Sequence, residues 1–563
     1  MRGLERGLAA IGYADDPGLG RDPPRMLLGV MCAALVLIVV VLGTRLTFFN
    51  DDWWFLLQRP GLAAHPGIDV VLAPHNGNLV ALVVPVYKLL VAVFGLDFQL
   101  PFRLVLGAAL ASVGVLIYVL VSARMGRTVG LVAAALVLFL GPAWEDLLFF
   151  ASIDLIGSLA IGLGALVALE RDFPRRNAIA CGLVVCSVLM SNLGIAFVVP
   201  AAVAVGLRRR PRQLWIAAIP ALVFAVWWIG YGSDAPSHLS AANIEHLPRY
   251  VFGSVTSGLA SLTGLNRGSG APHYVRGGIA LLAGTAALAA SWYKGHRPSS
   301  WVLVFASAAI SFWVLTGASY FPGRDPFASR YQLIDAALLI LIAAEAFRSV
   351  PLRTASLGVI AAGATLAVVS NGYALSTGYT FMREQSRYVK ADLGALEIER
   401  AVAPATVWLA EPVARNPYLS GVTAGLYFTE TRAHGTPPFY SPAQIRATPP
   451  LLRQAADSVL ASGEMTAKPT VRARGTGNCQ TLIAGSVGHS SEIDLPPRGA
   501  RLTDLTADVL VIRVRRFAPA DLPDPIDFLA PGKPVSVTTA PDAVSTPWRL
   551  TATGTGRYSI CPQ

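Results

Sequence analysis

Charged residues are scarce in this sequence. Asp, Glu, Lys and Arg make up 14% of its 563 residues, whereas an average soluble domain carries about 25%. Hydrophobic residues make up 54% of the chain, and its mean hydropathy is +0.54. This composition excludes an ordinary soluble globular protein and indicates a chain that crosses a membrane several times.

Cysteine is also rare, with five residues in the whole chain. Three of them, Cys32, Cys181 and Cys186, lie within apolar runs, and no spacing of Cys and His is typical of a zinc site. The other two, Cys479 and Cys561, lie in a polar region and are expected to form a disulfide if that region is outside the cell. Two unpaired thiols are the alternative.

The net charge of +11 agrees at first sight with a nucleic-acid-binding protein. The basic residues, however, are confined to short clusters between apolar runs, as in the cytoplasmic loops of membrane proteins. We therefore exclude nucleic acid as a partner and expect membrane lipids around the chain. The same clusters place the N-terminal segment 1–25 in the cytoplasm and the protein in the plasma (inner) membrane.

About eleven apolar runs are predicted as transmembrane helices, because most approach the ~20 residues that cross a bilayer as a helix. They form a domain over residues 26–373 with two long outer loops, 47–103 and 232–275. With this assignment every short basic cluster lies on one side of the membrane, and the C-terminus lies on the other. The runs are approximately 26–46, 104–122, 128–143, 153–169, 177–191, 193–207, 214–231, 277–293, 301–318, 331–347 and 354–373.

One further apolar run, 79–95, lies inside the first outer loop. If it crossed the membrane, every later basic loop would change sides, which contradicts the charge distribution. The run is also interrupted by Pro85 and carries Lys88. We therefore predict an interfacial helix that lies along the membrane surface.

The composition changes after residue 373, because long apolar runs end and Gly, Pro, Thr, Ser and Asp become frequent. Residues 380–402 are expected to form an amphipathic helix. Short apolar segments then follow between Pro and Gly clusters and predict strands at Thr406–Leu409, Thr481–Ala484 and Val509–Val514. We predict an extracytoplasmic domain over 374–563 with an α/β or β-sandwich fold.

Two adjacent carboxylates, Asp51 and Asp52, follow directly after the first predicted transmembrane helix. Aromatic residues flank them in the segment Phe48-Phe49-Asn50-Asp51-Asp52-Trp53-Trp54, and such rings suit the headgroup layer of a bilayer. The segment is either a solvated helix end within an ordinary aromatic belt or a catalytic carboxylate site facing a lipid-borne substrate. The pair alone does not decide between these interpretations.

Further polar and ionisable residues gather at the predicted outer ends of the helices. Polar groups near a membrane are costly unless they face a cavity or one another, so this clustering indicates a site at the outer leaflet. Ordinary solvated loops give the same one-sided pattern, which is the alternative for each residue taken alone. The residues are His75, Asn76, Glu145, Asp146, Asp154, His246, Arg249, Arg324, Arg330 and Tyr331.

The order of these features resembles the GT-C superfamily of polyprenyl-phosphate-sugar-dependent glycosyltransferases, which includes lipid A aminoarabinose transferases and protein O-mannosyltransferases. In organisation the likeness covers residues 26–373. The sequence departs from the family at Pro74-His75-Asn76, where members often carry a Lys or Glu motif. The features that carry the likeness are Asp51-Asp52 after the first helix, the long first outer loop with its interfacial helix, the later cluster Glu145, Asp146 and Asp154, and Ser329-Arg330-Tyr331 at a helix start.

This resemblance implies a role for most of the polar residues. A sugar on a lipid phosphate has a good leaving group, so the reaction needs a base for the acceptor hydroxyl and cations for the departing phosphate. Asp51 or Asp52 suits the base. Arg330 and Arg324 suit the phosphate, because a guanidinium binds phosphate oxygens bidentately, and Tyr331 lies beside them in the sequence.

The second acidic cluster offers oxygen ligands for a divalent cation, Mg²⁺ or Mn²⁺, from Glu145, Asp146 and Asp154. Helix capping is the alternative for Asp154, because a carboxylate is favoured near a helix start in any case. Four residues remain as candidates for positioning the acceptor or substrate: His75, Asn76, His246 and Arg249.

We therefore predict an inverting glycosyltransferase that moves a sugar from a polyprenyl phosphate to a cell-envelope glycan, lipid or protein at the outer face of the membrane. A transporter or flippase of a lipid-linked saccharide is one alternative. It predicts charged residues near the middle of the helices, and the helix interiors are nearly free of charge. The other alternative is a non-catalytic, membrane-anchored glycan-binding protein, which gives the acidic residues no role.

Overall fold

The structure is a computed structural model that describes residues 23–58, 67–235, 238–266, 272–400, 417–419, 422–470, 478–486, 488–489, 491–497, 499–540, 542 and 544–562. The chain forms two compact units. The first comprises Met1–Arg45, Pro60–Leu90 and Gln99–Phe381, and the second comprises Leu46–Arg59, Val91–Phe98 and Met382–Gln563. Two segments of the predicted first outer loop therefore group with the C-terminal region.

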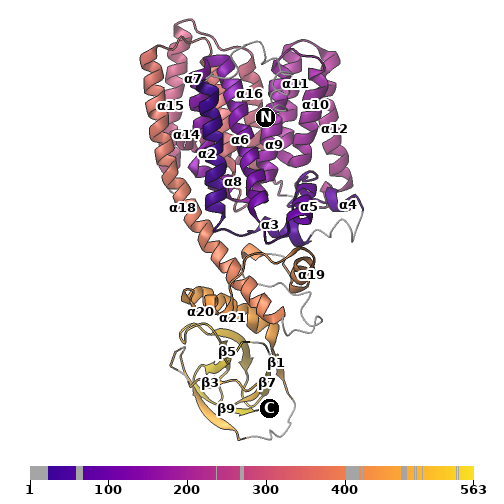
Figure 1. The fold of residues 1–563 in the computed structure, drawn as a ribbon, viewed down its shortest axis with the longest axis vertical. Coiled ribbons are helices and arrows are strands. Elements are labelled where there is room, and N and C mark those ends of the chain that lie inside the picture. The colour runs from indigo at the N-terminus through magenta and orange to yellow at the C-terminus, as the bar shows by residue number, and fades with distance from the viewer. Residues whose placement is uncertain are drawn as a thin grey trace. The chain divides into compact units, whose positions relative to one another are not determined.

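The first unit is built from helices, most of which run side by side as a bundle (Figure 1). Two of the helices, α5 and α18, continue from the first unit into the second. The helices are α2 Pro23–Gly43, α4 Asp69–Leu72, α5 Val83–Phe94, α6 Leu100–Met125, α7 Arg127–Leu138, α8 Trp144–Leu148, α9 Ile153–Glu170, α10 Arg176–Met190, α11 Ile195–Leu207, α12 Trp215–Gly230, α13 Ala241–Glu245, α14 Leu247–Leu262, α15 Pro272–Tyr293, α16 Trp301–Ala318, α17 Ser329–Ala346 and α18 Thr354–Arg400.

Among the described residues, seven helices are long and apolar enough to cross a membrane. The number rises to eight if the bent pair Arg127–Leu138 and Gly141–Leu148 is one span. Each of the eleven predicted runs contains a helix, but three are not among these seven or eight. Helices α10 and α11 have 15 and 13 residues, fewer than a full span needs, and the 18-residue α17 carries Arg330, Asp335 and Glu345. The prediction of a polytopic helical membrane protein with a C-terminal β-rich domain is confirmed.

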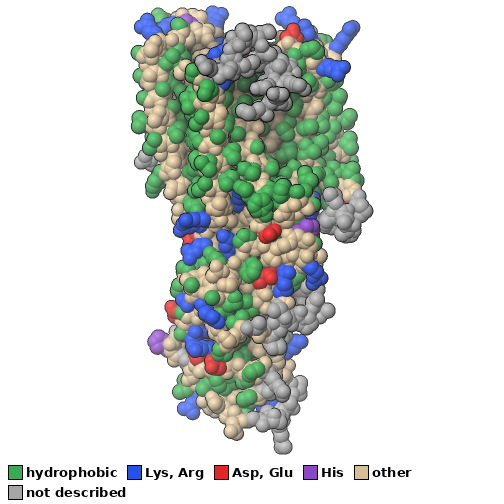
Figure 2. All heavy atoms as spheres, in the orientation of Figure 1, with side chains coloured by type: hydrophobic (Ala, Val, Ile, Leu, Met, Phe, Trp, Pro, Cys, Tyr) green, Lys and Arg blue, Asp and Glu red, His purple; other side chains and the backbone are tan. Residues whose placement is uncertain are grey.

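On the face shown in Figure 2, hydrophobic side chains cover most of the helical unit, and Lys and Arg gather at its end. Large apolar side chains such as Leu37, Leu222, Leu282 and Val359 are more than half exposed. A bundle surrounded by lipid tails has this surface, because no water is present to penalise exposed apolar groups.

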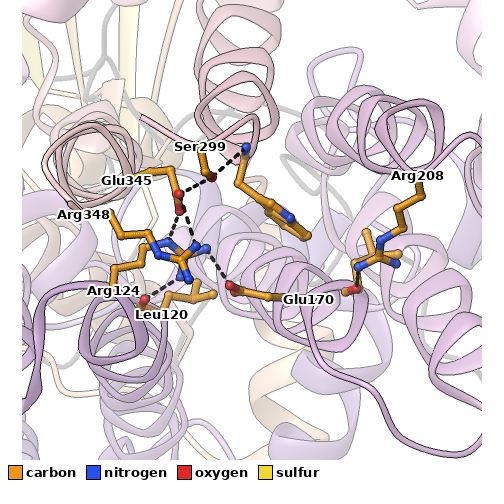
Figure 3. A network of polar contacts seen from close by, with 9 residues as sticks. Leu120, Arg124, Glu170, Arg208, Ser299, Glu345 and Arg348 are labelled. Atoms are coloured by element: carbon orange, nitrogen blue, oxygen red, sulfur yellow. Dashed lines mark hydrogen bonds and ion pairs between the residues drawn. The ribbon is translucent and has the colours of Figure 1, made fainter. Parts of the chain in front are cut away.

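Several helix ends are joined by a buried charge network around Arg124, at the end of α6 (Figure 3). Arg124 Nη2 lies 2.9 Å from Glu170 Oε1 at the end of α9, and Nε pairs with Glu345 Oε2 near the end of α17. Ser299 also donates to Glu345, and Arg348 Nη1 lies 3.5 Å from it. Because removing one partner of a buried ion pair is costly, this network fixes α6, α9 and α17 against one another.

The chain bends by 42° between α7 and α8, within the third predicted transmembrane run. Gly141 occupies the bend and lies directly against α18. A Cβ at this position would come within 1.7 Å of the Asn371 carbonyl oxygen, so the contact requires glycine. The bend allows Trp144 of α8 to stack edge-on against Phe381, with ring centroids 5.6 Å apart.

Helix α14 lies within residues 232–275, a segment that the sequence presents as an outer loop. It has 16 residues and packs against α15, α16 and α17. Ser257 Oγ and Ser261 Oγ donate to Gln332 Oε1 of α17 at 2.9 and 2.8 Å. Small hydroxyl residues suit a close helix–helix contact but lower the hydropathy of the segment, so the helix has no apolar run that marks it.

The second unit begins its C-terminal part with the end of α18. This helix runs for 47 residues without interruption, so the predicted helices at 354–373 and 380–402 are one element. The predicted strand Thr406–Leu409 lies outside the described residues. The other helical elements of the unit are α3 Asp51–Trp53, η1 Trp54–Gln58, η7 Pro417–Leu419, α19 Ala424–His434, α20 Pro442–Arg446 and α21 Pro450–Glu464.

A β-sandwich, residues 465–562, completes the second unit. One sheet has the strand order β1-β7-β4-β9-β2 and the other has β3-β8-β5-β6, with antiparallel neighbours throughout. Alternate residues of β4, β5 and β7 are buried, as expected when one face of each sheet forms the core. The strands are β1 Met465–Pro469, β2 Gln480–Ala484, β3 Ile493–Asp494, β4 Ala500–Asp504, β5 Leu510–Arg515, β6 Asp524–Leu529, β7 Pro534–Thr539, β8 Arg549–Thr553 and β9 Gly556–Pro562.

Cys479 and Cys561 form a disulfide, the pair that the sequence proposed. Cys561 lies on β9, and Cys479 directly precedes β2, which pairs with β9. The disulfide therefore reinforces a contact that the sheet already makes.

A buried carboxylate, Asp457 of α21, attaches this helix to the segment that follows β5. Its oxygens accept the backbone N–H groups of Arg516, Phe517 and Ala518 at 2.7–3.0 Å. Burial nevertheless raises the pKa of the Asp457 carboxyl to about 6, and the three N–H donors offset this effect only in part. Protonation of Asp457 therefore favours the folded state.

We expect this group to make the β-sandwich more stable in acid. The stabilisation that the Asp457 carboxyl gives should be fully present below about pH 4. As the pH rises from there through 6, the free energy of unfolding should fall by roughly 3 kcal/mol. Urea unfolding of the full chain between pH 4 and 8, followed by proteolysis of the C-terminal region, measures the slope. Asp457→Asn should flatten it, and an unchanged slope in this variant would contradict the assignment.

Candidate active site

The adjacent carboxylates Asp51 and Asp52 lie at the start of the short helix α3, in the second unit. Asn50 precedes them with φ 45° and ψ −114°, a backbone conformation that a non-glycine residue rarely adopts. Asp52 is 1% exposed, and its Oδ2 accepts the Phe49 N–H at 2.9 Å. Asp51 is only half-buried. The two carboxylates therefore have different surroundings: Asp52 supports the turn, and Asp51 is the more accessible of the two.

Aromatic packing holds this turn, which we call the Asp51 turn (residues 47–53). Trp53 Nε1 donates to the Phe48 carbonyl at 3.1 Å, and the two rings meet edge to face. Phe49 stacks on Tyr418 with ring centroids 4.6 Å apart. Phe48, Phe49 and Trp53 are buried, so these rings hold the turn by packing inside the protein. Of the four aromatic residues that the sequence suggested for the headgroup layer, only Trp54 is half-buried.

In the first unit, the structure brings together Glu145 of α8 and Arg330 of α17. Glu145 Oε2 lies 3.3 Å from Arg330 Nε and 3.2 Å from the Arg330 backbone nitrogen. Ser329 Oγ accepts the Glu145 N–H at 3.0 Å and donates to the Pro142 carbonyl at 2.8 Å. Glu145, which the sequence assigned to a metal cluster, is thus the ion-pair partner that orients Arg330.

The other two carboxylates of the predicted second cluster differ from Glu145. Asp146 is fully buried, and neither of its carboxylate oxygens has a hydrogen-bond partner among the described residues. Asp154 lies in the first turn of α9, and its Oδ1 accepts the Leu155 N–H at 2.6 Å. In the part of the chain that the structure describes, no group of three or more His, Cys, Asp or Glu residues is arranged to hold a metal ion. The divalent cation stays a prediction, and no step of the proposed reaction uses it.

Arg324 and Tyr331 flank Arg330 but make different contacts. Arg324 Nη1 donates to Ser319 Oγ at 3.0 Å, and its guanidinium covers the Phe321 ring. Tyr331 is buried, and its ring meets Phe312 of α16 edge to face. Tyr331 therefore packs between helices, whereas Arg330 and Arg324 keep partly exposed guanidinium groups at the start of α17.

His75 and Asn76 form a tight hairpin turn. Asn76 and Gly77 both have positive φ, 48° and 75°, as a type I′ turn requires, and His75 and Asn78 exchange backbone hydrogen bonds. Asn192, at the break between α10 and α11, holds the turn: its Oδ1 accepts the Leu79 N–H and its Nδ2 donates to the Gly77 carbonyl, both at 2.9 Å. Asn192 was not among the predicted site residues, and an Asn between two apolar runs was the available signal.

His246 and Arg249 lie at the start of α14 with exposed side chains. Within the described residues, no hydrogen bond or ion pair joins either of them to Glu145, to Arg330 or to the hairpin turn at His75 and Asn76. Their predicted role with the acceptor or substrate stays a prediction.

No protein-family model matches this chain, and no curated protein matches it. A similar solved structure is the single-particle cryo-EM structure of arabinosyltransferase EmbB from Mycobacterium smegmatis. The two chains share 13% sequence identity at a TM-score of 0.31, over 99% of this chain and 66% of the other. This chain thus spans less than two thirds of the length of that protein, and the likeness does not identify its activity.

Proposed function

We propose that this chain is an inverting glycosyltransferase that moves a sugar from a polyprenyl-phosphate donor to a cell-envelope glycan, lipid or protein. The observation that carries the proposal is the Asp51 turn. A strained residue, Asn50, precedes an accessible carboxylate, and the turn follows directly after the first apolar helix. Backbone strain of about 1–3 kcal/mol persists only where surrounding contacts enforce it, and such strain collects at catalytic and ligand sites.

In the proposed reaction, Asp51 takes the proton of the acceptor hydroxyl as the hydroxyl oxygen attacks the anomeric carbon. The bond from that carbon to the phosphate oxygen breaks, and the polyprenyl phosphate leaves with the electron pair. Attack opposite the leaving group inverts the anomeric centre. Because the phosphate leaves readily, the chain needs a base and a cationic group but no strong general acid.

The proposed cation is Arg330, with Arg324 beside it. Glu145 contacts the inner nitrogen of the Arg330 guanidinium, Nε, and so fixes the direction in which the group points. A guanidinium carries its nitrogens in a planar fork, the geometry that phosphate oxygens accept. This arrangement supports a role for Arg330 in binding the anionic donor. The same basic clusters that the sequence places in the cytoplasm support an extracytoplasmic position for the reaction.

Arg330→Ala should weaken donor binding by about 10–100-fold, because it removes charge-assisted hydrogen bonds worth roughly 1.5–3 kcal/mol. The experiment compares purified wild type and variant in detergent, with the affinity for a polyprenyl phosphate and the transfer of radiolabelled sugar to an envelope acceptor extract as readouts. Arg212→Ala, at an exposed arginine on the predicted cytoplasmic side, is the matched control and should bind normally. Equal donor affinity in wild type and Arg330→Ala would remove Arg330 from the donor site, and absence of transfer by the wild type would overturn the function.

A further inference from the structure

The Asp51 turn depends on a part of the chain that lies more than 350 residues away in the sequence. We call it the α19 segment: η7 Pro417–Leu419 together with α19 Ala424–His434. The Asn50 N–H donates to the Tyr418 carbonyl at 3.0 Å, and the Tyr418 ring stacks on Phe49. Both contacts flank the strained backbone of Asn50. They therefore act on the residue that determines where the following carboxylates point.

The same segment also holds the other end of the first outer loop. The Leu96 N–H donates to the carbonyl of His434, the last residue of α19, at 2.8 Å. Gly95, with φ 73°, lies so close to that carbonyl that a Cβ would come within 2.7 Å of it. The α19 segment thus contacts the chain on both sides of the outer loop, at 47–53 and at 95–96.

Helix α19 is itself firmly attached to the last turns of α18. Tyr427 is fully buried, and its hydroxyl donates to Glu397 Oε1 at 2.7 Å. Arg400 Nη2 lies 2.8 Å from the same oxygen, and its guanidinium covers the Phe428 ring at 4.9 Å. Ser386, one of the first residues of α18 in this unit, accepts the Thr47 N–H at 3.3 Å. These contacts fix α19 and residue 47 of the turn to α18 within the second unit.

We propose that Tyr418 is a positioning residue for Asp51, and that the region after residue 381 belongs to the catalytic machinery through the α19 segment. The inference rests on the proposed function for its catalytic meaning. Tyr418 touches neither donor nor acceptor in this scheme. It keeps the Asn50 backbone in its strained conformation, and Asp51 is placed by that backbone. A carboxylate displaced by about 1 Å from its productive position loses up to ~10²-fold in rate, because the reacting atoms are no longer aligned.

The test compares Tyr418→Ala with Tyr418→Phe in the full chain in nanodiscs. Tyr418→Phe keeps the stacked ring, so it should transfer sugar as the wild type does. Tyr418→Ala should lower kcat by about 10–100-fold and leave the KM for the donor within a factor of two or so. A fall in donor affinity with kcat unchanged would overturn the proposal, because it assigns Tyr418 to binding.

A second readout does not depend on activity. Hydrogen exchange of the peptide spanning residues 46–58 reports the N–H groups of Phe49 and Asn50. Exchange there should become at least about tenfold faster in Tyr418→Ala and stay slow in Tyr418→Phe. Exchange in β5 of the same sample shows whether the second unit stays folded. If Tyr418→Ala unfolds that unit, Phe49→Leu removes the same stacking from the other side and must give the same loss of kcat with β5 still protected.

The two readouts separate failure of the inference from failure of the proposed function. Slow exchange at 46–58 in both Tyr418→Ala and Phe49→Leu overturns the positioning role, whatever the activity. If exchange is fast in these variants but the wild type transfers no sugar, Tyr418 does hold the turn in place. The proposed glycosyltransferase function is then the part that fails.

Discussion

Asp51→Asn is expected to lower the rate of sugar transfer by about 10²–10⁴-fold while donor binding survives, because it removes the proposed general base. The amide has the size and hydrogen-bonding reach of the carboxylate but cannot take the proton of the acceptor hydroxyl. The surroundings of the pair favour Asp51 for this role. Asp52 is buried and already accepts the Phe49 N–H, whereas Asp51 is half-buried at the first position of α3.

Asp52→Asn is the matched control for this prediction. An Asn at position 52 still has an oxygen that accepts the Phe49 N–H, so the turn should persist and transfer should stay within about tenfold of the wild type. Asp52→Ala removes the acceptor and should be more harmful than Asp52→Asn. The assay uses purified variants, radiolabelled polyprenyl-phosphate sugar and an envelope acceptor extract. Wild-type turnover in both Asp51→Asn and Asp52→Asn would exclude the base mechanism.

The transmembrane helices were predictable because the bilayer imposes one strong rule, a long apolar run for each span. Where that rule weakens, the prediction from sequence weakens too. Helix α14 uses Ser257 and Ser261 at its interface with α17, so its segment has the composition of a loop. The unbroken α18 was within reach, because residues 354–400 contain no proline, but the fall in hydropathy after 373 suggested two elements.

The sequence proposed where the site lies, which stays a prediction, but it did not give the contacts of the proposed residues. Asp51 and Asp52 stand out because two adjacent carboxylates directly after an apolar helix are costly and need a reason. Nothing in the local pattern indicates that Tyr418 supports them, since the hydrogen bond from Asn50 goes to a backbone carbonyl that every residue type carries. The pair Glu145 and Arg330, likewise, joins residues 185 positions apart. Such pairs follow from the packing of whole helices.

A buried arginine in the β-sandwich, Arg516, has the largest expected effect on stability. Its Nη2 lies 2.8 Å from Asp542 Oδ1 and 3.0 Å from the Val544 carbonyl, and Nε lies 2.9 Å from the Thr546 carbonyl. The side chains of Arg516 and Asp542 are only 4% and 3% exposed, and the guanidinium covers the Trp548 ring. The carboxylate that pairs with this cation is therefore almost completely shielded from water.

Arg516→Ala should cost about 3–5 kcal/mol of unfolding free energy, because it leaves the Asp542 carboxylate buried without its cation. For a unit of this size the loss corresponds to a fall of roughly 10 °C in the unfolding temperature, measured by thermal scans of the full chain with proteolysis of the C-terminal region as the readout. The double variant Arg516→Met with Asp542→Leu should recover much of the loss, since both charges are then gone.

Arg549→Ala is the control: Arg549 is 49% exposed and lies 3.5 Å from Asp494, so its removal should cost less than about 1 kcal/mol. If the Arg516 and Arg549 variants lose the same stability, burial does not determine the strength of these ion pairs.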